Sequence, residues 1–137
     1  MPYARAERAD IHYMTLPSVP ACPVGMPTIT FVHGGGGNNQ AFLFQLPFFA
    51  ARGYYAITIS VRGWGSSRLD DEDESLLASN YFAGDVLAVL DECRVERTAL
   101  VGHSIGGFLV TRTALEAAER LTHAVHVAGF KRLWWGA

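Results

Sequence analysis

The junction at residues 102–106 constrains this chain more than any other feature of its sequence. An apolar run, Ala99-Leu100-Val101, leads into Gly-His-Ser-Ile-Gly, and residues 107–120 then have the composition of a helix. A serine in a G-x-S-x-G turn between a strand and a helix is held on a sharp bend that exposes its hydroxyl as a nucleophile. The sequence therefore predicts a strand–turn–helix unit with Ser104 at its apex.

Apolar runs alternate with helical segments along the rest of the chain. We expect strands at residues 9–15, 28–32, 54–60, 99–101 and 124–128, and helices at residues 40–52, 80–93 and 107–120. Pro47 should end or kink the first half of the segment at residues 40–52. Nearly continuous apolar strands separated by helices are typical of a parallel sheet covered on both faces. We therefore predict one α/β domain over residues 1–137, with a mostly parallel sheet and helices on both faces.

Composition excludes several classes of protein. The 137 residues are 50% hydrophobic with a formal net charge of -2, which gives no electrostatic reason to expect a nucleic-acid partner. No apolar stretch approaches the ~20 residues of a membrane-spanning helix, and the N-terminus lacks the apolar core of a secretory signal. Cys22 and Cys93 are too few for a disulfide framework. We expect a soluble, cytoplasmic protein with no membrane partner.

A glycine-rich turn precedes the serine in the chain. His33 and four glycines follow the expected strand at residues 28–32. Backbone N–H groups in such a turn can face a substrate, because no side chains shield them. Together with the N–H of Ile105, at the start of a helix, they could donate to an oxyanion.

Other interpretations of these turns remain open. The glycine turn could bind a phosphate, but the fingerprint G-x-G-x-x-G has Asn39 in place of its third glycine, and Ser60 rather than an acid ends the next strand. A G-x-x-x-x-G-K-[ST] loop is absent, because Lys131 is the only lysine. Ser104 could also be a structural turn residue. The acidic run at residues 70–74 is interpreted as a solvated loop and not as a metal site.

Four motifs in this order resemble the α/β-hydrolase family, specifically its compact esterase, lactonase and C–C hydrolase branch. They are residues 33–37, 62–67 (Arg-Gly-Trp-Gly-Ser-Ser), 85–91 and 100–107, within a resemblance that covers about residues 9–130. It implies a serine hydrolase that acts on a small acyl substrate, an ester, lactone or related C–C compound, without a cofactor or metal. The implied site residues are the nucleophile Ser104, the oxyanion-hole residues Ile105, Gly35 and Gly36, and the structural residues His33, Gly34, Gly102, His103 and Gly106.

The sequence departs from the family pattern in two places. Ser60 stands where the family usually has an acid, two places before Arg62, which predicts a less rigidly held loop. The family's triad runs serine, acid, histidine in chain order, yet residues 129–137 contain neither an acid nor a histidine. The chain thus resembles the N-terminal half of the fold, without the last strands and lid. Loss of the base costs roughly 10^6 in turnover, so we expect a poor enzyme, with a non-catalytic relative or binding module as the alternative.

None of the histidines is assigned as a substitute base. His33 is expected to order the glycine turn, and His103 to point away from the hydroxyl of Ser104. His12 lies in the first expected strand, and His123 and His126 lie in or beside the last.

The last expected strand should form an edge of the sheet. It carries Val125 and Val127, and two tryptophans, Trp134 and Trp135, follow without an evident core to enter. An unpaired apolar edge favours association. We therefore expect self-association through this C-terminal edge strand.

Overall fold

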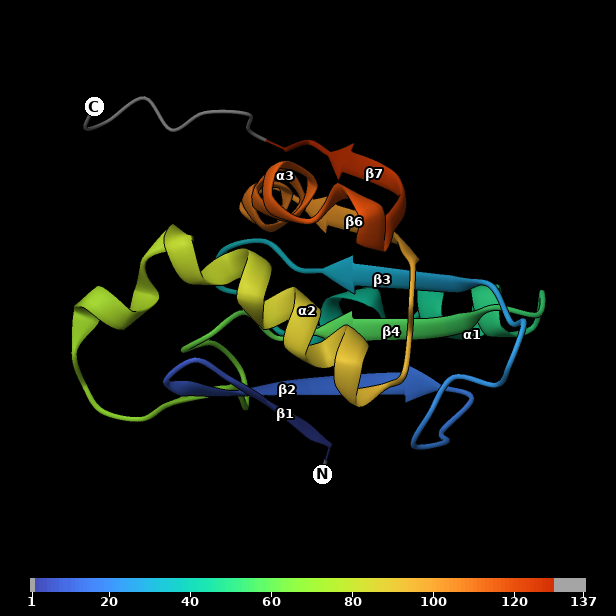
Figure 1. The fold of residues 1–137 in the computed structure, drawn as a ribbon, viewed down its shortest axis with the longest axis horizontal. Helices are drawn as coiled ribbons and strands as arrows, with labels where there is room; N and C mark the ends of the chain where they lie inside the picture. Colours follow the sequence, from blue (N-terminus) through green and yellow to red (C-terminus); the bar gives the residue numbers. More distant parts are fainter. Residues whose placement is uncertain (1, 130–137) are drawn as a thin grey trace.

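A mixed sheet of seven strands forms the centre of the computed structural model, which describes residues 2–129 (Figure 1). The strand order is β1-β2-β4-β3-β6-β7, and β5 pairs with β2 off this path. Strand β3 is parallel to β4 and β6, and β6 is parallel to β7, whereas β2 is antiparallel to β1, β4 and β5. The predicted α/β class is confirmed, with antiparallel pairing confined to the N-terminal side of the sheet.

The bounds of the elements follow the predicted alternation closely. The strands are Tyr3–Ala6 (β1), Ala9–Leu16 (β2), Thr28–Val32 (β3), Tyr55–Ile59 (β4), Arg68–Leu69 (β5), Thr98–His103 (β6) and Leu121–Val127 (β7). The helices are Gln45–Ala50 (α1), Phe82–Glu92 (α2) and Gly106–Glu116 (α3), with 3-10 turns at Asn39–Phe42 (η1), Glu74–Leu77 (η2), Ser79–Tyr81 (η3) and Ala118–Arg120 (η4). All five predicted strands are present, and β1 and β5 are additional.

The helical segment predicted at residues 40–52 is interrupted, as expected, but the interruption lies before Pro47 and not at it. It is divided into η1 and the short helix α1, and Pro47 is the third residue of α1. In the first turn of a helix the N–H that proline lacks has no intrahelical partner, so Pro47 neither ends nor kinks α1. The helix predicted to reach residue 120 ends at Glu116, because Ala117 leaves the helical conformation with φ −150°.

Apolar side chains fill both faces of the sheet. One core contains Val32, Ile57 and Leu100 from the strands together with Val86 of α2 and Leu109 of α3. The core on the other face packs strand residues such as Ile29 and Phe31 against Leu46, Phe42 and Phe49 of α1 and η1. Figure 1 shows α1 behind the sheet and α2 in front of it. This two-sided burial explains why β3 and β4 are nearly continuous apolar runs, interrupted only by buried threonines.

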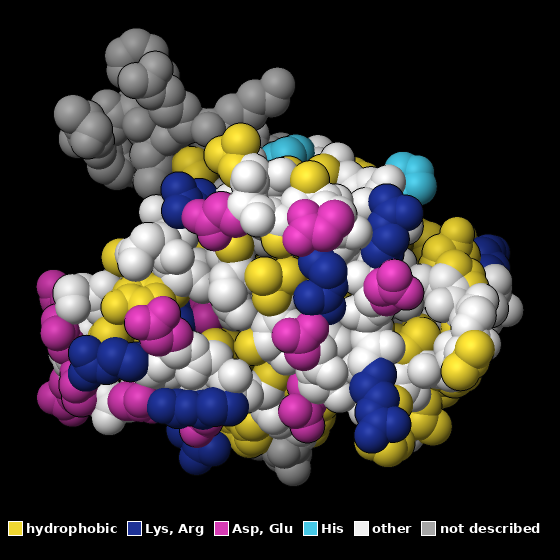
Figure 2. All heavy atoms as spheres, viewed as in Figure 1, with side chains coloured by type: hydrophobic (Ala, Val, Ile, Leu, Met, Phe, Trp, Pro, Cys, Tyr) yellow, Lys and Arg dark blue, Asp and Glu magenta, His cyan; other side chains and the backbone are white. Residues whose placement is uncertain are grey.

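Charged side chains of both signs are interspersed on the face shown in Figure 2. Acidic side chains gather at the end where the segment between β5 and α2 lies. Over residues 2–129, no helix combines the length and hydropathy needed to cross a membrane. The same residues contain no group of three or more histidine, cysteine or acidic side chains placed to hold a metal ion.

Candidate functional site

Ser104 occupies a strained backbone conformation at the junction of β6 and α3. Its φ is +53°, in the left-handed region that residues with a side chain rarely adopt. The Ser104 N–H donates to the carbonyl oxygen of Val127 at 3.0 Å, and its own carbonyl accepts from the Gly107 N–H at 2.9 Å. Such strain persists only where the surrounding structure holds it, and it is concentrated at functional sites.

Two glycines allow the strand and helix to meet at this bend. A Cβ at Gly102 would lie 2.3 Å from the carbonyl oxygen of Gly106. A Cβ at Gly106 would lie 2.4 Å from the carbonyl oxygen of Val32 in β3. Both positions therefore exclude any side chain, as the G-x-S-x-G pattern indicates.

The glycine turn after β3 lies directly against Ser104. A Cβ placed on Gly34 would come within 3.2 Å of the Ser104 Cβ, and one on Gly35 within 3.4 Å of the Ile105 Cδ1. Gly36 has φ +75° and no neighbour within 4 Å of its Cβ position. Among the described residues, the backbone N–H groups of Ile105, Gly35 and Gly36 have no hydrogen-bond acceptor. The structure thus brings the two predicted turns into contact.

His33 holds the glycine turn in place through both ring nitrogens. Its Nε2 accepts a hydrogen bond from the Val61 N–H at 2.9 Å, which leaves the proton on Nδ1 to donate to the Gly34 carbonyl at 2.7 Å. The side chain is fully enclosed, and burial lowers its pKa. A neutral imidazole engaged at both nitrogens orders the turn and has no position left for the hydroxyl proton of Ser104.

Ser60 connects three segments at the carboxyl edge of the sheet. Its hydroxyl accepts from the Asn39 N–H at 3.1 Å, and its carbonyl accepts from the Ser67 hydroxyl at 2.7 Å. The Ser67 hydroxyl in turn accepts from the N–H of His12 at 2.8 Å. The Ser67 hydroxyl therefore ties the loop at residues 62–67 to β2 and to the end of β4, and the Ser60 hydroxyl holds the start of η1.

A buried ion pair beneath this loop was not singled out from the sequence. Arg62 donates from Nε and Nη2 to the two carboxylate oxygens of Asp85, at 2.7 Å and 2.6 Å. Arg62 also donates to the carbonyls of Leu76 and Glu7, at 2.9 Å and 3.0 Å. The sequence did contain a signal for this pair, because Asp85 lies among the apolar residues of α2 and a buried carboxylate needs a charged or hydrogen-bonding partner.

Neither an acid nor a histidine side chain is hydrogen-bonded to the Ser104 hydroxyl within the described part of the chain. His103 is exposed and makes no side-chain hydrogen bond there, and Nε2 of His126 is 3.0 Å from the Thr111 hydroxyl. Nδ1 of His12 is paired with the Asn39 side chain at 2.8 Å. The described residues thus place a serine and nearby N–H donors together, without a base.

Known proteins of one family resemble this chain in sequence. A family model described as "Alpha/beta hydrolase family" matches residues 31–137. An epoxide hydrolase from Caballeronia sordidicola is 31% identical over 94 residues, an alignment that covers 69% of this chain and 28% of that protein. The 2-hydroxy-6-oxononadienedioate/2-hydroxy-6-oxononatrienedioate hydrolase of Paraburkholderia phymatum is 31% identical over 112 residues, covering 77% of this chain and 37% of the relative.

A solved structure gives the same result at the level of the fold. Est816, described as an N-acyl homoserine lactone degrading enzyme, aligns with a TM-score of 0.79 and 27% identity, over 93% of this chain and 45% of its own. The chain therefore spans less than half the length of these three proteins.

Proposed function

Because this chain belongs to the α/β-hydrolase family, we propose that it carries the nucleophile and oxyanion half of a serine hydrolase site for ester, lactone or related acyl substrates. The observation that carries the proposal is the backbone of Ser104, which has φ +53° and lies in close contact with the glycine turn at Gly34. A strained serine beside unpaired backbone donors is the arrangement that acyl transfer requires.

The chemistry would proceed from the Ser104 hydroxyl. Its oxygen attacks the carbonyl carbon of the substrate, and the negative charge that develops on the carbonyl oxygen is stabilised by the N–H of Ile105 and by that of Gly35 or Gly36. Both glycine N–H groups are without an acceptor among the described residues. The leaving group departs as the acyl-enzyme forms, and water then releases the acid.

Several relatives are hydrolases of other bonds, such as the epoxide hydrolase already described. The family resemblance associates an aspartate nucleophile with epoxide hydrolases, and here Ser104 occupies that position. A serine favours acyl substrates, in keeping with the lactone-degrading activity described for Est816.

Catalysis also needs a base to accept the proton of Ser104. The described residues bring no histidine to the hydroxyl, and the segment after β7 has no acid or histidine in its sequence. In serine hydrolases without the base, an enhancement of roughly 10^3 to 10^4 over water remains. We propose weak, Ser104-dependent turnover for residues 1–137, and a non-catalytic role if none is found.

The test is hydrolysis of p-nitrophenyl acetate by residues 1–137, together with labelling by a fluorophosphonate probe and mass mapping of the modified peptide. We expect slow turnover and a label on Ser104, both abolished by Ser104→Ala. Ser79→Ala is the matched control, because Ser79 is an exposed serine on η3. Turnover and labelling that are identical in the wild type and Ser104→Ala would refute the proposal for this chain and favour the non-catalytic alternative.

A further inference from the structure

The connector between β2 and β3, residues 17–27, carries one of the two cysteines of this chain. Cys22 lies near its middle, and Cys93 directly follows the last residue of α2. The N–H of Cys22 donates to the carbonyl oxygen of Cys93 at 2.8 Å. Two cysteines that are far apart in the sequence are therefore in direct backbone contact.

That hydrogen bond brings the two side chains within reach of each other. Standard backbone geometry across it limits the distance between the two Cα atoms to at most about 6.7 Å. The Cα atoms of a disulfide lie about 4.4–6.8 Å apart. Both cysteines are free thiols, and Cys22 packs against the buried apolar cluster that contains Cys93. The pair therefore meets the distance requirement of a disulfide, and its side chains face the same core.

The two thiols lie in different environments. Cys93 is fully enclosed, and burial raises the pKa of its thiol to about 11. Cys22 is only partly buried, in a connector where the neighbouring Val24 is fully exposed. The sulfur of Cys22 lies 3.5 Å from the Thr28 hydroxyl and 3.5 Å from the Pro23 carbonyl oxygen, so it is turned toward its own connector and the start of β3. A small oxidant can therefore reach Cys22 and not Cys93.

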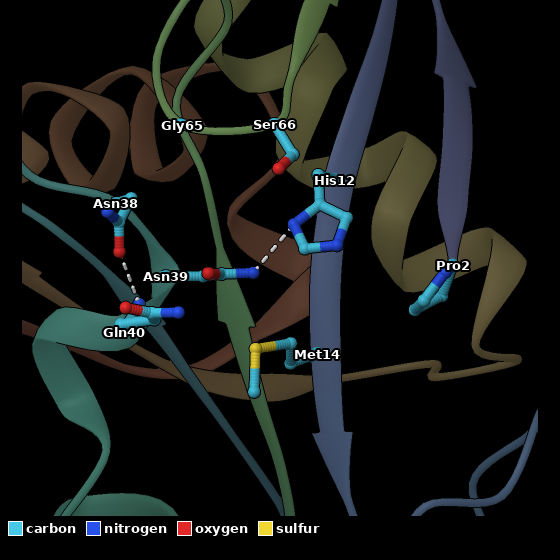
Figure 3. A pocket seen from close by; sticks show the side chains of 8 residues that line it. All are labelled: Pro2, His12, Met14, Asn38, Asn39, Gln40, Gly65 and Ser66. Carbon is cyan, nitrogen blue, oxygen red and sulfur yellow. Dashed lines mark hydrogen bonds between the residues drawn. The ribbon is translucent and has the colours of Figure 1, made fainter.

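This cysteine pair lies away from the openings at the carboxyl edge of the sheet. Ser104 follows β6 at that edge, and the pocket in Figure 3 has His12 and Asn39 in its wall. Cys22 instead precedes β3, and Cys93 lies in the segment that leads into β6, so both are at the amino edge (Figure 1). The following inference therefore does not depend on the proposed hydrolase function.

We propose that Cys22 and Cys93 are a redox-sensitive pair, which a small disulfide such as oxidised glutathione converts into one intramolecular disulfide. The thiolate of Cys22 attacks one sulfur of the oxidant, whose S–S bond breaks and releases a first thiol. The Cys93 thiol then loses its proton to water and attacks the Cys22 sulfur, and the second thiol leaves. The protein loses two hydrogen atoms in all, and the oxidant is reduced to two thiols.

The new bond fastens the connector to the end of α2. It closes a long loop that contains β3, α1, β4 and α2, and a long closed loop restricts the unfolded chain more than a short one. We expect the oxidised protein to melt at least about 5 °C above the reduced protein. In a reducing compartment the pair stays as two thiols, so oxidising conditions would stabilise the fold.

The test is incubation of residues 1–137 with oxidised glutathione, followed by intact mass measurement, peptide mapping and non-reducing electrophoresis. We expect a chain that has lost two hydrogen atoms, with one peptide pair linked through Cys22 and Cys93 and no covalent dimer. Its melting temperature should fall by at least about 5 °C when the bond is reduced. Stable glutathione on Cys22 without the cross-link, or a disulfide between two chains, would overturn the proposal.

Two matched variants test the order of the steps. Cys93→Ala removes the second thiol, so the mixed disulfide with glutathione should accumulate at Cys22. Cys22→Ala removes the accessible thiol, so Cys93 should stay unmodified in the native chain and react only after unfolding in urea. Modification of native Cys22→Ala at a rate equal to that of native Cys93→Ala would contradict the assigned order. If Cys93→Ala does not fold, the cross-link in the wild type still decides, and a cross-link that forms only in urea would overturn the proposal.

Discussion

At Gly102 and Gly106, a single Cβ atom would prevent the close approach of β6, α3 and β3 at the turn. Both Cβ positions would lie within 2.5 Å of a backbone carbonyl oxygen, and backbone cannot move aside as a flexible side chain can. The short-range pattern G-x-S-x-G was enough to predict this feature, because the requirement comes from the turn itself. The contact between Gly34 and Ser104 joins two turns that are far apart in the sequence. No local pattern specifies this contact, and the order of the motifs only suggested that the two turns lie close together.

The residue-scale prediction is that Gly102→Ala and Gly106→Ala each lower the free energy of unfolding by about 3 kcal/mol or more, as severe overpacking does. Gly84→Ala is the matched control, since no atom lies within 4 Å of its Cβ position on α2. That change should stabilise the helix by about 0.5–1 kcal/mol. Urea unfolding followed by circular dichroism measures all three, and equal effects at residues 84 and 102 would contradict the steric explanation.

At the scale of elements, the strands that are buried along their whole length were the ones that the sequence predicted most directly. Strands β3 and β4 are buried throughout, so their apolar runs identified them. Strand β1 has only one buried residue and β5 has two residues in all, so their extended form depends on pairing with β2. The Arg62–Asp85 pair joins residues 23 apart in the sequence, and no local pattern specifies such a contact.

That pair connects the loop after β4 to α2, and its removal should loosen both. Burial raises the pKa of Asp85 against the opposing pull of Arg62, so the two hydrogen bonds offset a cost of desolvation. Asp85→Asn or Arg62→Met leaves one member buried without its partner, and we expect a loss of about 3–5 kcal/mol in the free energy of unfolding. The matched control is Glu116→Gln, which breaks the exposed pair with Arg112 on α3 and should cost at most about 0.5 kcal/mol. Chemical denaturation measures the difference, and comparable losses at residues 85 and 116 would show that the buried pair does not connect these elements.

For the whole molecule, the decisive feature is the edge of the sheet at β7. Within residues 2–129, β7 is the terminal strand of the sheet, and only Leu121 of its seven residues is buried. Val125 and Val127 are 40% and 46% exposed. The sequence also predicted that Trp134 and Trp135 contribute to an apolar patch at this edge. These two residues lie outside the described residues. An edge strand with exposed apolar side chains is a template for pairing with another chain, so the expectation of self-association stays a prediction.

Sedimentation velocity across a wide range of concentration tests this prediction. We expect the weight-average mass of residues 1–137 to rise with concentration, and Val125→Lys to suppress the rise, because a lysine on an edge strand opposes pairing. Leu115→Lys is the matched control, since Leu115 is an apolar side chain that is 75% exposed and lies on the helix α3, which has no strand edge to pair. If both lysine variants act alike, general hydrophobicity drives the association. A wild-type chain that stays monomeric at every concentration would show that the apolar edge of β7 does not by itself recruit a second copy.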